Sequence, residues 1–283
     1  MPKTAILLIT CPDRKGLVAA IANFLLEYNA NILHADQHQD NGLGLFFMRV
    51  EFDLEGFALD EGQFRAAFGP IAEQNSMTWQ LAYGDRKPVI AIFVSKYLHC
   101  LADLLLRHST GELNCSIALI VGNHEDARPL ATFYGLPFHF ISMTGETRQE
   151  GERRQLELLA SAGAELIVLA RYMQVLSPGF VERYPRRIIN VHHSFLPAFT
   201  GARPYHAAFE RGVKLIGSTS HYVTEVLDDG PIIEQDVTRI SHSDQIADLI
   251  QKGRDLERVV LSRAVRWHLE HRILSYANKT VVF

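Results

Sequence analysis

Along residues 1–84 the apolar positions alternate between strand spacing and helix spacing. The apolar run from Thr4 to Thr10 predicts a strand, and apolar residues at helical spacing between Leu17 and Tyr28 predict a helix. Asp40-Asn-Gly42 predicts a hairpin turn between two further strands. The predicted elements are strands at 4–10, 32–39, 45–52 and 77–83 and helices at 17–28 and 60–74. Their order, βαββαβ, is typical of a ferredoxin-like domain.

The rest of the chain shows a different rhythm, in which short, almost wholly apolar runs alternate with helical stretches. Val89–Val94 is such a run and is typical of a strand buried on both faces. Further elements are predicted at 98–107, 116–121, 126–134, 138–141, 148–162, 166–169 and 188–192, with a last helix from 243 or 246 to 274. Such alternation predicts a Rossmann-like, mostly parallel sheet with helices on both faces. The fold class is therefore α/β, with a linker at 85–88 between domains at 1–84 and 89–283.

The composition of the chain bears on which partners it is expected to bind and on the cellular compartment in which it works. The chain has 283 residues, 21% of them charged, and a formal net charge of −4, so no general attraction to nucleic acid or to an anionic membrane is expected. Its three cysteines form no Cys-x-x-Cys pair, which favours a reducing compartment over a disulfide framework. The apolar run near the N-terminus is too short for a signal sequence or a membrane span. We expect a cytoplasmic protein.

Candidate chemistry is concentrated in the second domain. Asn190 and His192 are two residues apart in a β-branched run, so their side chains leave the same face of a strand. The run ends in a proline-containing loop, where a cleft would open, and Asp228 follows downstream. Asn can donate to a developing oxyanion, His changes protonation near neutrality, and Asp can orient or deprotonate water. The combination suits a reaction at an acyl carbon, and ordinary polar residues at a strand end are the alternative interpretation.

Five patches of the second domain occur together. They are 170–178, 190–197, 201–206, 217–221 and 227–231. In order and spacing they resemble the catalytic domain of enzymes that use 10-formyltetrahydrofolate. The first turn of the N-terminal domain, Cys-Pro-Asp-Arg-Lys-Gly-Leu at 11–17, resembles that of an ACT regulatory domain. The whole chain therefore resembles the formyltetrahydrofolate deformylase family, which hydrolyses 10-formyltetrahydrofolate to tetrahydrofolate and formate and so supplies formate for purine synthesis.

The resemblance implies roles for individual residues. Asn190, His192 and Asp228 would be the catalytic trio, with Asp228 accepting a proton from the attacking water. The substrate-binding residues would be Tyr172, Met173, Val175, Leu176, Ser194, Leu196, Pro197 and His221. Residues 172–176 would form part of a pocket for the pterin ring, and core packing is the alternative role for Met173, Val175 and Leu176. A structural hydrogen bond is the alternative for His221. His193 is expected to face away from His192 on the strand.

For the N-terminal domain, the resemblance implies a small regulatory ligand, usually an amino acid, bound near the first turn between paired ACT domains. Asp13, Gly16 and Asn31 are the candidate ligand-binding residues. Asp13 and Gly16 could instead only cap and close the turn. Because ACT-like domains usually work in pairs, a homo-oligomer is expected.

One departure from the related transferases bears on the reaction. Transformylases that act on a ribonucleotide have a Gly-rich loop after the first strand of the catalytic domain to hold a phosphate, whereas Val94–Cys100 contains no glycine. Water is therefore the expected acceptor. The alternatives are a formyltransferase acting on an unidentified amine and a folate or amino-acid sensor without turnover. His99-Cys100 and His124-Glu125 lack a second ligand pair, so neither a metal nor another cofactor is expected.

Overall fold

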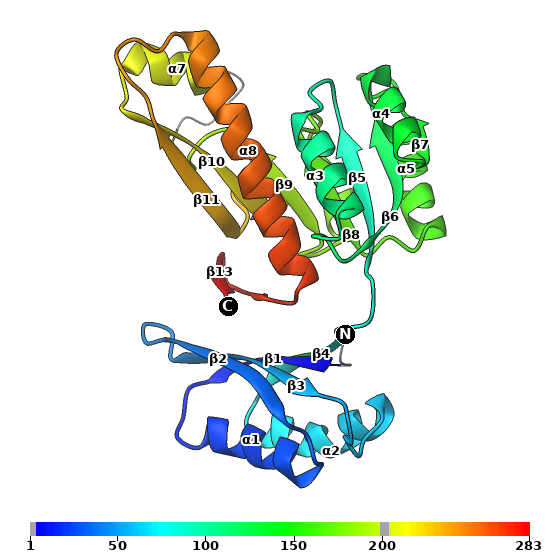
Figure 1. Cartoon of the computed structure of the whole chain (residues 1–283), viewed down its shortest axis with the longest axis vertical. Helices are drawn as coiled ribbons and strands as arrows, with labels where there is room; N and C mark the ends of the chain where they lie inside the picture. Colours follow the sequence, from blue (N-terminus) through cyan, green and yellow to red (C-terminus); the bar gives the residue numbers. More distant parts are fainter. Residues whose placement is uncertain (1–3, 199–203) are drawn as a thin grey trace. The chain divides into compact units, whose positions relative to one another are not determined.

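The computed structural model describes residues 4–198 and 204–283, which divide into two compact units (Figure 1). The first unit comprises Met1–Lys87, Glu270–Leu274 and Val281–Phe283, and the second comprises Pro88–Leu269 and Ser275–Thr280. The main boundary, between Lys87 and Pro88, lies inside the segment predicted as a linker. The last residues, predicted to belong wholly to the second domain, are instead divided between the two units.

The first unit contains the four-stranded antiparallel sheet that the βαββαβ pattern predicts. Its elements are β1 (Thr4–Pro12), α1 (Leu17–Glu27), β2 (Ile32–Asp40), β3 (Leu45–Asp53), α2 (Glu61–Gln74) and β4 (Thr78–Tyr83), in the sheet order β2-β3-β1-β4. Phe24 of α1 meets Phe64 and Phe68 of α2 edge-on, with ring centroids 5.3 and 5.1 Å away. At the start of α2, Asp60 and Gln63 each accept a hydrogen bond from the other's backbone N–H, which caps the helix.

The second unit is built on a seven-stranded sheet. Its elements are β5 (Val89–Val94), α3 (His99–Ser109), β6 (Ser116–Gly122), η1 (Glu125–Ala127), α4 (Arg128–Phe133), β7 (Phe138–Phe140), α5 (Arg148–Ser161), β8 (Leu166–Ala170), α6 (Pro178–Val181), β9 (Ile188–His192), α7 (Pro204–Arg211), β10 (Leu215–Tyr222), β11 (Ile232–Arg239) and α8 (Ile246–Leu269). Strands β5 to β9 pair in parallel, whereas β10 is antiparallel to both β9 and β11. The sheet is mixed but mainly parallel, which confirms the predicted fold class.

The strand order of this sheet, β11-β10-β9-β8-β5-β6-β7, has a switch point at β5. From β5 the chain adds β6 and β7 on one side and then returns to add β8 and β9 on the other. In open α/β sheets, ligands bind beyond the carboxyl ends of the strands next to such a switch. The loops that begin with Arg171 after β8 and with His193 after β9 leave the sheet at this edge.

The last helix is shorter than predicted. It ends at Leu269 rather than near residue 274, because His271 adopts a left-handed backbone conformation, with φ of 51°, that interrupts a right-handed helix. The chain then forms a hairpin of β12 (Ile273–Tyr276) and β13 (Lys279–Val282), which the sequence analysis missed. Within residues 4–198 and 204–283, no helix combines the length and the apolar character needed to cross a membrane.

Candidate active site

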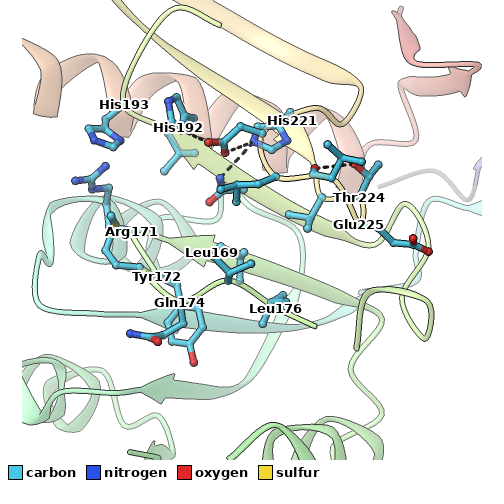
Figure 2. A pocket seen from close by; sticks show the side chains of 18 residues that line it. Leu169, Arg171, Tyr172, Gln174, Leu176, His192, His193, His221, Thr224 and Glu225 are labelled. Carbon is cyan, nitrogen blue, oxygen red and sulfur yellow. Dashed lines mark hydrogen bonds and ion pairs between the residues drawn. The ribbon is translucent and has the colours of Figure 1, made fainter. Parts of the chain in front are cut away.

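A pocket of about 360 Å³ opens at the carboxyl ends of β8 and β9 (Figure 2). Three stretches of chain line it: Leu169 with Arg171–Leu176 after β8, Asn190–His193 at the end of β9, and His221 with Val223–Asp228 at the end of β10 and in the loop that follows. Figure 2 shows His192, His193 and His221 along one wall and Tyr172 and Leu176 along the other. A concave site with apolar walls and a few converging polar groups is typical of a small-molecule site.

Asn190, His192 and Asp228 meet on one side of this pocket, together with His221. His192 Nδ1 lies 3.1 Å from Asp228 Oδ2, and His221 Nε2 lies 3.6 Å from Asp228 Oδ1. Asn190 Nδ2 lies 3.3 Å from His221 Nε2, and His221 Nδ1 lies 2.9 Å from the Tyr222 carbonyl oxygen. Since a carbonyl only accepts, His221 Nδ1 carries a proton, and in the neutral ring Nε2 accepts from the Asn190 amide. His221 therefore holds the Asn190 side chain in place.

The negative charge of Asp228 determines which ring nitrogen of His192 carries a proton. Burial by itself raises the pKa of Asp228, but the hydrogen bond from His192, the hydrogen bond that His221 donates when its ring is protonated, and the charge of the protonated rings outweigh burial and hold the pKa well below its usual range. The resulting carboxylate accepts a hydrogen bond from His192 Nδ1–H. His192 Nε2 is buried and has no hydrogen-bond partner among the residues that the structure describes. Because an unpaired buried nitrogen is costly, this atom is the one that the site leaves for a ligand or water.

Asp228 is held by a loop of unusual backbone geometry. Its φ of 56° lies in the left-handed region, which Asp tolerates better than most residues and which recurs at functional sites. A Cβ on Gly230 would overlap the Tyr222 carbonyl oxygen, so glycine is required for the loop to pass this close to β10. The Tyr222 N–H donates to the Pro231 carbonyl at 2.9 Å. The Asp-Gly-Pro pattern therefore fixes the carboxylate relative to β10.

The four predicted pterin-pocket residues all line the pocket, but in two different ways. Tyr172 and Leu176 are buried in the core of the unit, and Gln155 Nε2 donates to the Tyr172 hydroxyl at 2.8 Å. Burial raises the pKa of Tyr172 to about 12, so the hydroxyl stays neutral. Met173 and Val175 are half exposed at the rim. Core packing, the alternative considered from the sequence for Met173, Val175 and Leu176, therefore applies to Leu176 and not to Met173 and Val175, which remain accessible to a ligand. Tyr172, for which it was not considered, is buried as well.

Three other predicted substrate contacts lie in the loop after β9, and none is among the described residues that line this pocket. The Ser194 hydroxyl donates to the Ala198 carbonyl at 2.8 Å, and the Leu196 N–H donates to the Thr219 hydroxyl at 3.0 Å. Pro197 is exposed. The observed partners of Ser194 and Leu196 give them a structural role in holding the loop.

His193 does not face away from His192 as expected. It lines the same pocket, and the two ring centroids are 5.0 Å apart. The alternation of a strand no longer applies because β9 ends at His192. The sequence analysis also missed Arg171, Val226 and Leu227 as lining residues. Val226 and Leu227 are 62% and 65% exposed, and an apolar pair within a polar loop was the signal that could have found them.

Comparison with known proteins gives the family. Residues 89–265 match the formyl transferase family, and residues 5–69 match the ACT domain family. A formyltetrahydrofolate deformylase from Synechocystis sp. is 54% identical over 280 residues, which cover 99% of this chain and 98% of that protein. The crystal structure of a formyltetrahydrofolate deformylase from Pseudomonas syringae has a TM-score of 0.98 at 46% identity, over 100% of this chain and 95% of that one. The chain belongs to the formyltetrahydrofolate deformylase family.

The chain also resembles, less closely, the structure of a transformylase. The crystal structure of glycinamide ribonucleotide transformylase 1 from Symbiobacterium toebii has a TM-score of 0.66 at 27% identity and covers 72% of this chain and 98% of that one. The resemblance drawn from the five sequence patches and from the first turn is thereby confirmed at the level of both families.

In the ACT domain, the three predicted ligand residues lie near the first turn or at the start of β2. Gln39 Nε2 donates to Asp13 Oδ2 at 3.0 Å, and the Asn31 carbonyl accepts from the Asp53 N–H at 2.9 Å. Gly16 precedes α1 with φ of 94°, a conformation that favours glycine. Among the described residues, no hydrogen bond joins the side chains of Asp13 and Asn31. The turn-closing role is seen for Gly16, and ligand binding stays a prediction for all three.

A second group of titratable residues lies at the carboxyl end of β5. His99 Nε2 is 2.7 Å from Glu257 Oε2, and Arg171 Nε is 3.3 Å from the same oxygen. The Tyr205 hydroxyl donates to Glu257 Oε1 at 2.7 Å. With Cys100, the side chains of His99 and Glu257 bring three possible metal ligands within 4.8 Å of one another, which sequence spacing did not reveal. Burial raises the pKa of the Cys100 thiol, and both Glu257 oxygens already have partners, so the group fits a hydrogen-bonded ion pair better than a metal site.

Proposed function

We propose that this chain hydrolyses 10-formyltetrahydrofolate to tetrahydrofolate and formate. The observation that carries the proposal is the unpartnered Nε2 of His192, which lies in the pocket while Nδ1 of the same ring contacts Asp228. A ring nitrogen held in this way can take a proton from water and return it to a leaving group. The Synechocystis and Pseudomonas syringae proteins, which match this chain over nearly its whole length, are formyltetrahydrofolate deformylases, which supports this substrate and this reaction.

In the proposed mechanism, a water molecule attacks the formyl carbon while His192 Nε2 takes one of its protons. The Asn190 amide donates to the formyl oxygen, which becomes an oxyanion as the carbon becomes tetrahedral. Collapse of this intermediate breaks the bond between the carbon and N10, and the imidazolium gives its proton to N10. The formic acid then gives its acidic proton to solvent water and leaves as formate, so atoms and charge balance.

Asp228 acts in this scheme as the electrostatic partner of His192. The sequence analysis gave it the proton of the attacking water. Because the two histidines hold its pKa well below the usual range, Asp228 is a weak base near neutrality. Its negative charge instead keeps the proton on Nδ1 and stabilises the imidazolium that forms, as the Asp of a Ser-His-Asp triad does.

Two features support water over an amine as the acceptor. The segment from Val94 to Cys100 contains no glycine, so a cradle of closely approaching N–H groups for an acceptor phosphate is not expected there. Beside this segment, the Glu257 carboxylate is buried and already bound by His99 and Tyr205. Glu257 therefore offers no free carboxylate oxygen to a charged amine beside this segment.

The experiment that tests the proposal measures formate released by the purified full-length protein from 10-formyltetrahydrofolate, without an amine and after treatment with EDTA. We propose that no metal or other cofactor is needed, and we expect equal amounts of formate and tetrahydrofolate. Release that requires an added amine would replace hydrolysis by the transferase alternative. Folate binding without turnover would contradict both and favour a sensor.

The proposed reaction belongs to one-carbon metabolism, in which the formate supplies purine synthesis. We propose that it takes place in the cytoplasm, in keeping with the cysteine content.

We further propose that the ACT domain binds a small effector such as an amino acid. The edge strand β2 exposes Ile32 and Leu33, and an exposed edge of this kind can pair with a second copy of the chain. We therefore propose a homo-oligomer. Light scattering of the purified protein tests this by measuring the molar mass in solution, and the mass of a single chain would contradict it.

A further inference from the structure

A smaller cavity, of about 290 Å³, lies at the switch point of the sheet and adjoins the 360 Å³ pocket, which is called the folate pocket because the proposed substrate binds there. The segments after β5 and β8 line it, together with α8. Arg171, Met173 and His193 line both cavities, and Figure 2 shows the Arg171 guanidinium directed toward His193. The two cavities therefore meet next to His192, where the proposed reaction takes place.

More positive than negative charge lines this smaller cavity. The guanidinium carbons of Arg171 and Arg254 lie 5.8 and 5.3 Å from the centre of the Tyr97 ring. Glu257 is the one carboxylate among the described lining residues. Its side chain is 1% exposed and is engaged by His99 and other partners, so its charge does not balance both arginines in the cavity.

The two guanidinium groups retain hydrogen-bond donors for a ligand. The Arg171 side chain is only 9% exposed, and its Nε lies 3.3 Å from Glu257 Oε2, while its two terminal nitrogens make no hydrogen bond within residues 4–198 and 204–283. Arg254 makes no ion pair with a carboxylate of that described part of the chain. Buried charged donors are costly when unpaired, and a guanidinium offers parallel N–H groups that match a carboxylate. The arrangement is that of a receptor for a small anion.

We propose that this cavity receives the formate formed in the folate pocket and holds it against Arg171 and Arg254 before release. The inference rests on the proposed hydrolysis, in which the water oxygen joins the formyl carbon, the bond to N10 breaks, N10 takes a proton and formate leaves as an anion. Tetrahydrofolate still fills the larger pocket at that moment, so the adjoining cavity is the path open to formate. Added formate then binds beside the folate, lowering kcat and leaving the KM for the folate nearly unchanged.

The test titrates isotopically labelled formate into the full-length protein and follows binding by NMR line broadening. Arg254→Met removes one guanidinium, and Arg258→Met is the matched control, because Arg258 lies on α8, pairs with Asp255 and is outside the described cavity lining. We expect the wild type and Arg258→Met to bind formate equally and Arg254→Met to bind it roughly tenfold more weakly, as for the loss of a charge-assisted hydrogen bond. Inhibition of tetrahydrofolate formation by added formate is measured in parallel.

Equal formate affinity in Arg254→Met and the wild type would overturn the proposal. Inhibition that only raises the KM for the folate would also overturn it, since formate would then occupy the folate pocket. Displacement of formate by lower concentrations of inorganic phosphate would assign the cavity to larger oxyanions instead. The binding titration needs no turnover, so a protein that binds formate here but does not hydrolyse the folate contradicts the proposed function separately.

Discussion

Two carboxylates in the described part of the second unit, Asp228 and Glu257, each pair with a histidine, and the two pairs differ in what they leave unpaired. In the open pair, His192 Nδ1 and Asp228 Oδ2 are 3.1 Å apart, and the remaining ring nitrogen has no partner in the described part of the chain. In the saturated pair, His99 Nε2 and Glu257 Oε2 are 2.7 Å apart, and the second carboxylate oxygen accepts from the Tyr205 hydroxyl. The first pair lines the folate pocket and the second lines the smaller cavity.

Burial does not tell the two pairs apart. The side chain of His192 is 7% exposed and that of His99 is 15% exposed, so the ring proposed for catalysis is the more buried of the two. In each pair, burial raises the pKa of the carboxyl, and the partners more than compensate, so that the net shift is downward. The difference lies in the atom left for a ligand. Reactivity in this unit therefore follows from the unsatisfied nitrogen rather than from the ion pair itself.

Breaking the open pair should have the largest effect, and that effect should be on turnover. Asp228→Asn removes the charge that keeps the proton on Nδ1, His192→Ala removes the proton carrier, and Asn190→Ala removes an oxyanion donor. We expect each to lower kcat about a hundredfold to a thousandfold, measured as formate release by folded protein. Asp229→Asn is the control, because Asp229 is exposed and outside the described pocket lining. Turnover near the wild-type value would remove that residue from the mechanism.

Breaking the saturated pair should act on stability. Glu257→Gln leaves the Arg171 guanidinium without its anion in a buried site, and we expect the free energy of unfolding to fall by about 3 kcal/mol in a denaturant titration. The partners lower the pKa of Glu257 in the folded state below its usual value of 4.5. Its contribution is therefore present above the unfolded-state pKa and is lost as the pH falls through the folded-state pKa.

The pH dependence separates charge loss from a simple packing defect. Wild-type stability should decline on acidification below about pH 4.5, and the Glu257→Gln variant should decline less steeply because it lacks the titrating group. Equal acid sensitivity in the two proteins would show that Glu257 is not held as a charged partner of His99 and Arg171.

A smaller effect is expected from removing one donor of the saturated pair. Tyr205→Phe deletes the hydrogen bond to Glu257 Oε1, which should lower the free energy of unfolding by about 1.5 kcal/mol, as for a hydrogen bond to a charged group. Tyr184→Phe is a matched control, because Tyr184 is also buried but its hydroxyl makes no hydrogen bond with a described residue. Equal losses in the two variants would show that the Glu257 bond contributes nothing specific.

The open pair could be predicted from the sequence, whereas the saturated pair could not. Asn190 and His192 share one face of a strand, and Asp228 belongs to a turn with a recognisable Asp-Gly-Pro pattern, so local rules and the family resemblance bring them together. His99 and Glu257 come from α3 and α8, which are far apart along the chain. No spacing rule connects two helices that meet only through tertiary packing.

The same limit explains the errors in the fold. Strong periodicity predicted the strands and helices of the first unit to within two residues at each end. The C-terminal hairpin was missed because the apolar residues at its start continue the pattern of α8, and the left-handed backbone at His271, which ends the helical run, is not encoded by a Gly or Pro. His193 was misplaced for a related reason, since strand alternation was extended one residue beyond the end of β9.

The smallest effect expected here concerns the rim beside the open pair. Leu227 is 65% exposed and lines the folate pocket, so a bound folate would cover it. Leu227→Ala removes about 1 kcal/mol of apolar contact, which corresponds to roughly a fivefold higher KM with kcat nearly unchanged. Leu106→Ala, on an exposed apolar residue of α3 outside the described pocket lining, is the control and should alter neither constant. A fall in kcat in Leu227→Ala comparable to that in Asp228→Asn would mean that the residue positions the carboxylate, so that rim and open pair would have to be treated as one catalytic loop.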